Sequence, residues 1–205
     1  MQKNHILKRL MAVSVAAAMF GAVGAQAQTA PPAGASSTTA TAAKLTSADR
    51  KAIMDMGMSN MAEVEMGKLA QSKSQNAEVK AFAQKMVDDH GKALTEVQTL
   101  AQSKGVTLPT ELDAKHKAMS DRLTKLSGDS FDKTYVKQGG VGAHKETLTK
   151  LQAASKGAKD PDVKAQVDKT IPVVQEHLKH AEQLAQGKSS STGSSGAAGH
   201  TGSSH

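Results

Sequence analysis

The chain has 205 residues with 26 Lys and Arg against 19 Asp and Glu, no Cys or Trp, one Tyr and three Phe. This length fits one domain with tails, and the lack of Cys excludes a disulfide framework, a thiolate metal site and a lipid-anchored lipoprotein. The mild basic surplus is spread along predicted helices and lacks the stacking aromatics of a nucleic-acid groove, so we expect no nucleic-acid partner.

The first 27 residues have the three parts of a secretory signal peptide. Basic residues within the first nine positions precede an apolar run over residues 10–25, and Ala25-Gln26-Ala27 supplies the small residues of a cleavage site. We expect cleavage after Ala27 and a periplasmic or secreted product. The apolar run is short for a membrane span and no second one follows, so no transmembrane segment is predicted in the mature chain. Its positive surplus allows loose association with an anionic envelope surface, and no protein partner is indicated.

Two segments have compositions that cannot bury apolar surface. Residues 28–44 carry Pro31-Pro32 and a Ser/Thr/Ala/Gly run, which predicts a disordered linker. Residues 188–205 are almost entirely Ser, Gly, Thr and Ala, which predicts a disordered tail. Residues 45–187 between them should form one helical-bundle domain.

Apolar residues in this domain recur at steps of three and four, and no segment alternates as a strand does. Three helix N-caps are predicted, at Thr46 or Ser47, at Asn76 and at Asp160. Pro161 suits the first position of a helix, and Gly105 suits the left-handed conformation that ends one. Five helices are predicted, over about 46–72, 76–104, 111–126, 130–156 and 160–186.

The connection between the second and third long helices is long enough to travel the length of a bundle. Such a crossover is typical of the ferritin-like arrangement. We therefore predict an all-α fold, a ferritin-like four-helix bundle with a short extra crossover helix between the second and third long helices. Pro172 should kink the last helix, and three glycines over residues 139–142 are costly inside a helix unless a neighbour approaches closely.

Each long helix places one residue that can bind a metal in its buried stripe. These residues are Glu63, His90, His144 and His177. Three imidazoles and one carboxylate suit a single Zn, Cu, Ni, Mn or Fe ion, so the predicted cofactor is one transition-metal ion of unknown identity. The alternative is a structural network of buried polar groups, since perturbed titratable residues serve both roles.

A two-metal centre is not expected. The ferritin-like di-iron pattern requires Glu-x-x-His on two helices, and here Val87 and Val174 stand where those glutamates would be. The sequence also carries no nucleophile elbow, phosphate loop or dinucleotide fingerprint, so we assign no catalytic residue and favour a protein that is not an enzyme.

Other polar and sulfur-containing residues have simpler interpretations. Five methionines suit either thioether ligation of Cu(I) or core packing: Met54, Met56, Met58, Met61 and Met66. Packing is favoured, because only Met54, Met58 and Met61 share a line. His116 and His180 are interpreted as surface or packing residues. Asp89 is either a solvated edge residue or an acceptor that orients a neighbouring imidazole.

Four segments together resemble a family of exported bacterial proteins with a domain of unknown function (number 4142). The resemblance spans about residues 45–185 and is carried by Asn60-x-x-Glu63-Val64-Glu65-Met66-Gly67, Val79-Lys80-x-Phe82-Ala83-x-x-Met86-Val87-x-Asp89-His90, Phe131-Asp132-x-x-Tyr135 with His144, and Ile171-Pro172-x-x-x-x-His177. It implies a ferritin-like bundle without an established activity, in a family often labelled as outer-membrane proteins. Its motif positions coincide with the four candidate ligands.

Two functions from different classes remain open on the sequence. The first is an envelope protein that binds one transition-metal ion in its core. The second is a non-catalytic envelope stress or interaction module whose buried histidines are structural.

Overall fold

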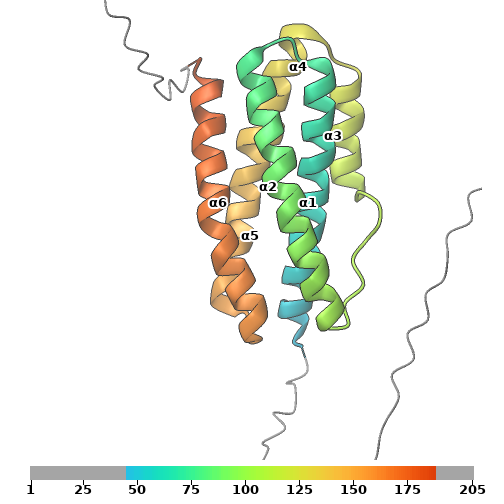
Figure 1. The fold of residues 1–205 in the computed structure, drawn as a ribbon, viewed down its shortest axis with the longest axis vertical. Coiled ribbons are helices and arrows are strands. Elements are labelled where there is room, and N and C mark those ends of the chain that lie inside the picture. The colour runs from blue at the N-terminus through green and yellow to red at the C-terminus, as the bar shows by residue number, and fades with distance from the viewer. Residues whose placement is uncertain (1–44, 188–205) are drawn as a thin grey trace, which may run out of the picture. The chain divides into compact units, whose positions relative to one another are not determined.

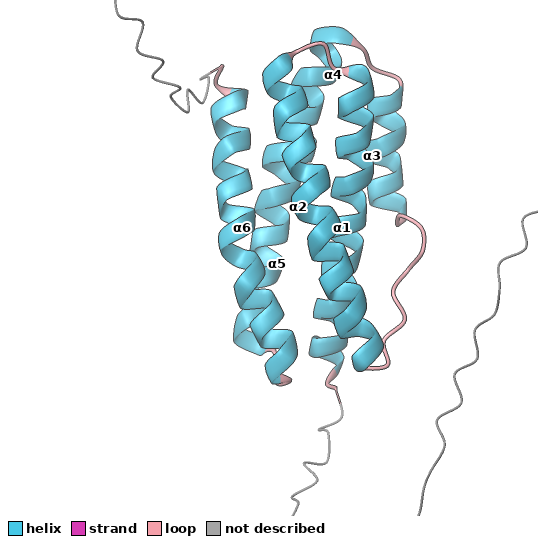
Figure 2. Ribbon diagram, in the orientation of Figure 1, coloured by secondary structure: helices cyan, strands magenta, loops and turns pink. Residues whose placement is uncertain are grey.

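The structure is a computed structural model that describes residues 45–187, in which every regular element is a helix. The predicted signal peptide, linker and tail lie outside these residues. The elements are α1 (Ser47–Lys73), α2 (Ala77–Ser103), α3 (Ala114–Thr124), α4 (Gly128–Thr134), the π-helix η1 (Tyr135–Gly142), α5 (Ala143–Gly157) and α6 (Pro161–Ala185) (Figures 1 and 2).

The helices form a bundle with one long crossover. α1 and α2 run antiparallel, and a loop with α3 then returns along the bundle to its other end (Figure 1). From there α4, η1 and α5 follow one another as the third long rod, and α6 runs back beside α5. Because α3 carries the chain back, α2 and α5 run in the same direction. The predicted all-α, ferritin-like bundle with a short crossover helix is confirmed.

The helix ends follow the predicted capping chemistry. Thr46 forms a capping box with Asp49, and the side chains of Asn76 and Asp160 each accept two backbone N–H bonds at the starts of α2 and α6. Gly105 has a φ of 64° just after α2, a conformation that favours glycine. Each such N-cap contributes about 1 kcal/mol of stability.

The core consists of two apolar clusters stacked along the bundle. One contains the large side chains of Met66, Phe82, Met86, Phe131 and Tyr135, and the other contains Ile53, Met56, Val97, Val163 and Val167. The predicted packing role holds for Met56 and Met66, which are buried, but it is wrong for Met54, which is 36% exposed. Met54 lies on a neighbouring face of α1, because the inward line of that helix runs through Ile53 and Met56.

The predicted continuous helix over residues 130–156 is interrupted. Residues 135–142 adopt the wider π-helical turn, so the rod consists of α4, η1 and α5. The glycines lower the cost of this change because they have no side chains to pack against the preceding turn. Pro172 lies within α6, which continues through it to Ala185.

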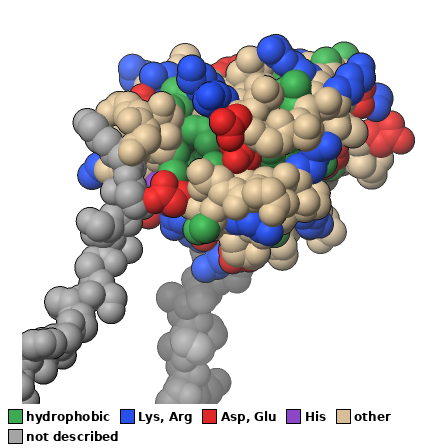
Figure 3. All heavy atoms as spheres, turned by 90° about the horizontal axis from the view of Figure 1, so that it is seen from above, with side chains coloured by type: hydrophobic (Ala, Val, Ile, Leu, Met, Phe, Trp, Pro, Cys, Tyr) green, Lys and Arg blue, Asp and Glu red, His purple; other side chains and the backbone are tan. Residues whose placement is uncertain are grey.

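Within residues 45–187 no helix is long and apolar enough to cross a membrane. Seen from above, the end of the bundle presents Lys and Arg side chains interspersed with Asp and Glu (Figure 3).

Candidate metal centre

The four predicted site residues lie at one level of the bundle and come from its four long rods. Glu63 is on α1, His90 on α2, His144 on α5 and His177 on α6, and none is more than 4% exposed. Along each helix this level falls between the two apolar clusters. Each polar side chain is therefore buried in an apolar environment, where an unpaired polar group is costly.

The three imidazoles converge. One ring nitrogen from each of His90, His144 and His177 lies within 4.8 Å of the other two. The ring centroids are 5.1 Å apart for His90 and His177, 5.5 Å for His90 and His144, and 5.6 Å for His144 and His177. The sequence prediction that these helices bring their histidines together is therefore supported by the geometry.

The tautomer of His90 is set by an amide. The Asn60 Nδ2 group donates to the Met56 carbonyl at 2.9 Å, which leaves Asn60 Oδ1 as an acceptor. His90 Nδ1 lies 2.8 Å from that oxygen and must donate its proton to it. His90 Nε2 therefore carries a lone pair.

The other two rings are held in the same way. His144 Nδ1 donates to the Gly140 carbonyl at 2.7 Å, and His177 Nε2 donates to Asp89 Oδ2 at 2.8 Å. Asp89 Oδ2 also accepts from Lys85 Nζ at 3.0 Å. The predicted alternative in which Asp89 orients an imidazole matches this contact, an arrangement common around metal-binding histidines.

Each ring has one nitrogen left over, and all three are buried without a hydrogen-bond partner. These atoms are His90 Nε2, His144 Nε2 and His177 Nδ1. A buried acceptor without a donor costs about 1–3 kcal/mol. A structural network would pair such atoms with donors, whereas here three neighbouring rings each keep a buried nitrogen without a partner.

Burial keeps the three imidazoles neutral. Desolvation lowers the pKa of His90 well below its ordinary value, and the nearby His144 and His177 rings add to the effect. Desolvation also lowers the pKa of His144 to about 4, and it lowers that of His177 despite the hydrogen bond to Asp89. Neutral imidazole is the form that binds a metal.

Glu63 lies beside this cluster rather than in it. Its Oε1 is 3.7 Å from His144 Nδ1, which already donates to Gly140, and its Oε2 has no partner. Burial raises the pKa of Glu63 to about 8, so its carboxyl is mostly protonated at neutral pH. Glu63 as a direct ligand stays a prediction.

The π-helix brings the third rod close to α6. A Cβ on Gly140 would lie 2.9 Å from the Cβ of Ala181, closer than real Cβ contacts allow. This close approach fixes the position of the Gly140 carbonyl, which in turn holds His144. The predicted reason for the glycines, a neighbouring helix at short distance, is correct for Gly140.

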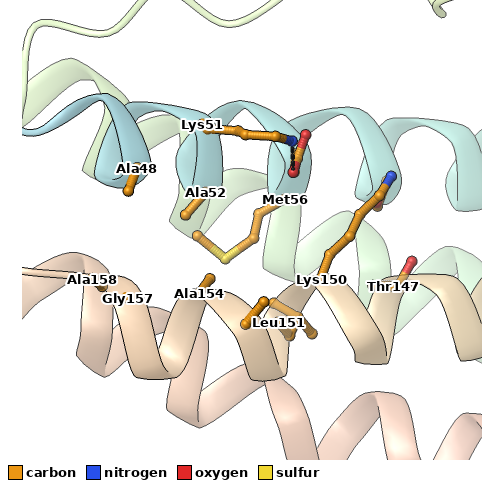
Figure 4. A pocket seen from close by; sticks show the side chains of 13 residues that line it. Ala48, Lys51, Ala52, Met56, Thr147, Lys150, Leu151, Ala154, Gly157 and Ala158 are labelled. Carbon is orange, nitrogen blue, oxygen red and sulfur yellow. Dashed lines mark hydrogen bonds and ion pairs between the residues drawn. The ribbon is translucent and has the colours of Figure 1, made fainter.

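Two cavities reach the level of the site from opposite sides. One lies between α2 and α6, has a volume of about 200 Å³ and includes His90 in its wall. The other, about 320 Å³, lies between α1, α3, η1 and α5 and includes Glu63. A separate apolar groove of about 260 Å³ between α1 and α5 is lined by Ala52, Met56 and Leu151 among others (Figure 4).

Sequence reasoning missed two groups that position the rings. Asn60 lies on the inward line of α1 three residues before Glu63, and this spacing was the available signal. The Gly140 carbonyl carried no signal, because its role depends on the π-helical turn. His116 bonds to Asp113 at its own helix start, and its side chain is 16% exposed. It lines the cavity that contains Glu63, so it is a packing residue, and it is not one of the three clustered histidines.

The sequence model of the family described as "Domain of unknown function (DUF4142)" matches residues 34–184. The chain belongs to this family. The match begins at residue 34 and thus includes part of the predicted linker. No curated protein matches the chain.

Several solved structures share the fold of this DUF4142 chain. A DUF305 fragment from Deinococcus radiodurans has a TM-score of 0.62 at 11% identity, covering 69% of this chain and 97% of that one. CopM in its Cu(II)-bound form has a TM-score of 0.58 at 19% identity, covering 68% and 96%. A DUF305 protein from Streptomyces coelicolor, described as secreted, has a TM-score of 0.59 at 13% identity, covering 69% and 94%. At these identities the likeness establishes the fold.

Proposed function

We propose that this domain is an exported metal-binding protein that holds one transition-metal ion through His90, His144 and His177. Two observations carry the proposal together: one ring nitrogen from each histidine lies within 4.8 Å of the other two, and each ring has one buried nitrogen without a hydrogen-bond partner. Each ring is already oriented by a hydrogen bond from its other nitrogen. A bound cation would satisfy all three lone pairs at once.

The surroundings suit a divalent ion. No proton has to leave the rings on binding, because burial already keeps them neutral. The Asp89 carboxylate behind His177 makes that imidazole a stronger donor. Glu63 is the nearest buried carboxyl group and supplies a negative charge if it ionises beside the ion. CopM, a protein of the same fold, has been solved with Cu(II) and with Ag, which makes copper the first ion to test.

The test is metal content and affinity of the full mature chain beginning at Gln28. His200 and His205 are replaced by Gln in the background, so that the tail cannot bind metal. After loading with Cu(II) or Zn(II) and desalting, we expect about one equivalent per chain by mass spectrometry. His90→Gln and His177→Gln should lose it, and His116→Gln is the matched control that should retain it. Equal retention by all three variants would refute the proposal.

The alternative is an interaction module with structural histidines. The apolar groove between α1 and α5 favours this alternative, because it offers a surface for a partner on the described domain. This function predicts no stoichiometric metal after loading. It also predicts that chelators leave the melting temperature unchanged, whereas the metal-binding function predicts a rise in Tm with the bound ion.

A further inference from the structure

We infer that the ion reaches the three imidazoles through the cavity between α2 and α6, with Asp89 and Glu176 as its first contacts, and that the cavity beside Glu63 is not the route. This inference rests on the proposed function and adds to it a defined entry path.

The first argument is position. The cavity between α2 and α6 has His90 in its wall together with Asn60 and Asp89, the side chains that hold His90 and His177. Asp89 is 37% exposed at its side chain, while His177, to which it bonds, is fully buried. The Asp89 carboxylate is therefore accessible to solvent on one side and is hydrogen-bonded to a buried imidazole on the other. The cavity on the other side has none of the three histidines in its wall.

The second argument is charge. The wall of the α2–α6 cavity contains the acidic side chains of Asp89, Glu96 and Glu176 and the basic ones of Lys92 and Lys169. Lys85 pairs with both Asp89 and Glu176, which brings the local balance to three acids and three bases. A cation meets no net positive charge at this cavity.

The cavity beside Glu63 has a positive surplus. It contains Lys115, Lys137 and Lys150 against Glu63 and Glu146, a positive surplus even with Glu63 charged. Of its two acids, Glu63 is buried with a raised pKa, and Glu146 pairs with both Lys115 and Lys150. A cation entering there would be repelled.

The third argument is the local weakness of α6. Pro172 has no backbone N–H, so the carbonyl of Asp168 lacks its helical donor one turn earlier. This weak point lies next to Lys169, Thr170 and Val173, which form the α6 side of the cavity. Opening this wall breaks fewer helical hydrogen bonds than opening an intact helix would.

The experiment measures the rate of Cu(II) uptake by the metal-free mature chain in a stopped-flow instrument, from the visible absorption of the bound ion. Ala93 and Ala143 are both partly buried, and each lines one of the two cavities. Ala93→Leu should slow uptake by roughly fivefold or more because it narrows the α2–α6 cavity, with equilibrium affinity nearly unchanged. Ala143→Leu narrows the other cavity and should leave the rate unchanged.

A second pair of variants tests the charge and does not depend on core packing. Glu176→Lys at the cavity mouth should slow uptake by roughly three- to tenfold at low ionic strength, and the effect should shrink with added salt. Glu182→Lys on the same helix makes the same change in net charge away from this cavity and is the matched control. Circular dichroism checks that each variant folds.

The outcomes separate the route from the proposed function. A wild-type protein that takes up no ion refutes both. A wild-type protein that binds one ion, but is slowed by Ala143→Leu and not by Ala93→Leu, refutes the route alone. Equal rates in Glu176→Lys and Glu182→Lys would also overturn the route, since charge at that mouth would then be irrelevant.

Discussion

Replacing Glu63 by Gln should stabilise the metal-free protein, increasingly so as the pH rises. The folded pKa of Glu63 is about 8, against 4.5 in the unfolded chain. Between pH 4.5 and pH 8 the folded protein keeps the Glu63 proton, whereas the unfolded chain has released it. The free energy of unfolding therefore falls as the pH rises through this range. At about 1.4 kcal/mol per pH unit, the free energy of unfolding of the wild type should fall by about 3–4 kcal/mol between pH 5 and pH 8 relative to Glu63→Gln.

The assay is urea unfolding of both proteins in the presence of a chelator, at pH 5, 6, 7 and 8. Glutamine has nearly the same shape and no charge, and the other titrating groups are shared, so the difference between the two curves isolates this carboxyl. With saturating metal the wild type should become the more stable of the two proteins above pH 7, because the ionised carboxylate then lies beside a cation. Parallel pH profiles for the two metal-free proteins would refute the assignment of a buried, protonated Glu63.

Three further predictions follow from the same geometry. Gly140→Ala forces a Cβ to within 2.9 Å of the Ala181 Cβ and should lower the free energy of unfolding, measured in urea, by about 2–3 kcal/mol. The control is Gly157→Ala, which has open space at its Cβ and should be neutral or stabilising. Similar losses in both variants would contradict the packing argument. The lowered pKa of His144, about 4 against 6.5, contributes stability that is present above pH 6.5 and lost as the pH falls toward 4. Metal-free wild type should therefore lose about 2 kcal/mol between pH 7 and pH 5 relative to His144→Gln, and an unchanged difference would argue against a neutral buried ring. Asp89→Asn should weaken metal binding by about 10- to 100-fold in competition with a chromophoric chelator, whereas unchanged affinity would show that the carboxylate behind His177 has no influence.

Much of the fold could be predicted because local chemistry determines it. The caps at Thr46, Asn76 and Asp160 define helix starts from a few neighbouring residues. The apolar periodicity defines the buried faces, and the long segment between α2 and α4 permits one crossover. The exception within the helices is η1, because the widening of a helical turn at Gly139 and Gly140 depends on how closely α6 packs there.

The candidate site could be predicted in part for the same reason. His90, His144 and His177 are each recognisable within their own apolar stripe, so the sequence identifies them one helix at a time. Whether Glu63 belongs with them is a different question, since a shift of about one residue in helix phase moves a side chain around the helix by 100°. The structure places its carboxyl behind His144 rather than among the free nitrogens.

The sequence by itself determined that three histidines and an acid lie on the buried faces of four amphipathic helices. Hydrophobic periodicity is a one-dimensional property, and it is sufficient to assign each of these residues to a buried face. Only the tertiary structure decided which nitrogen of each ring is available and which cavity reaches it. Those features depend on contacts between different rods, such as Asn60 with His90 and Asp89 with His177, and such contacts exist only after the helices have packed.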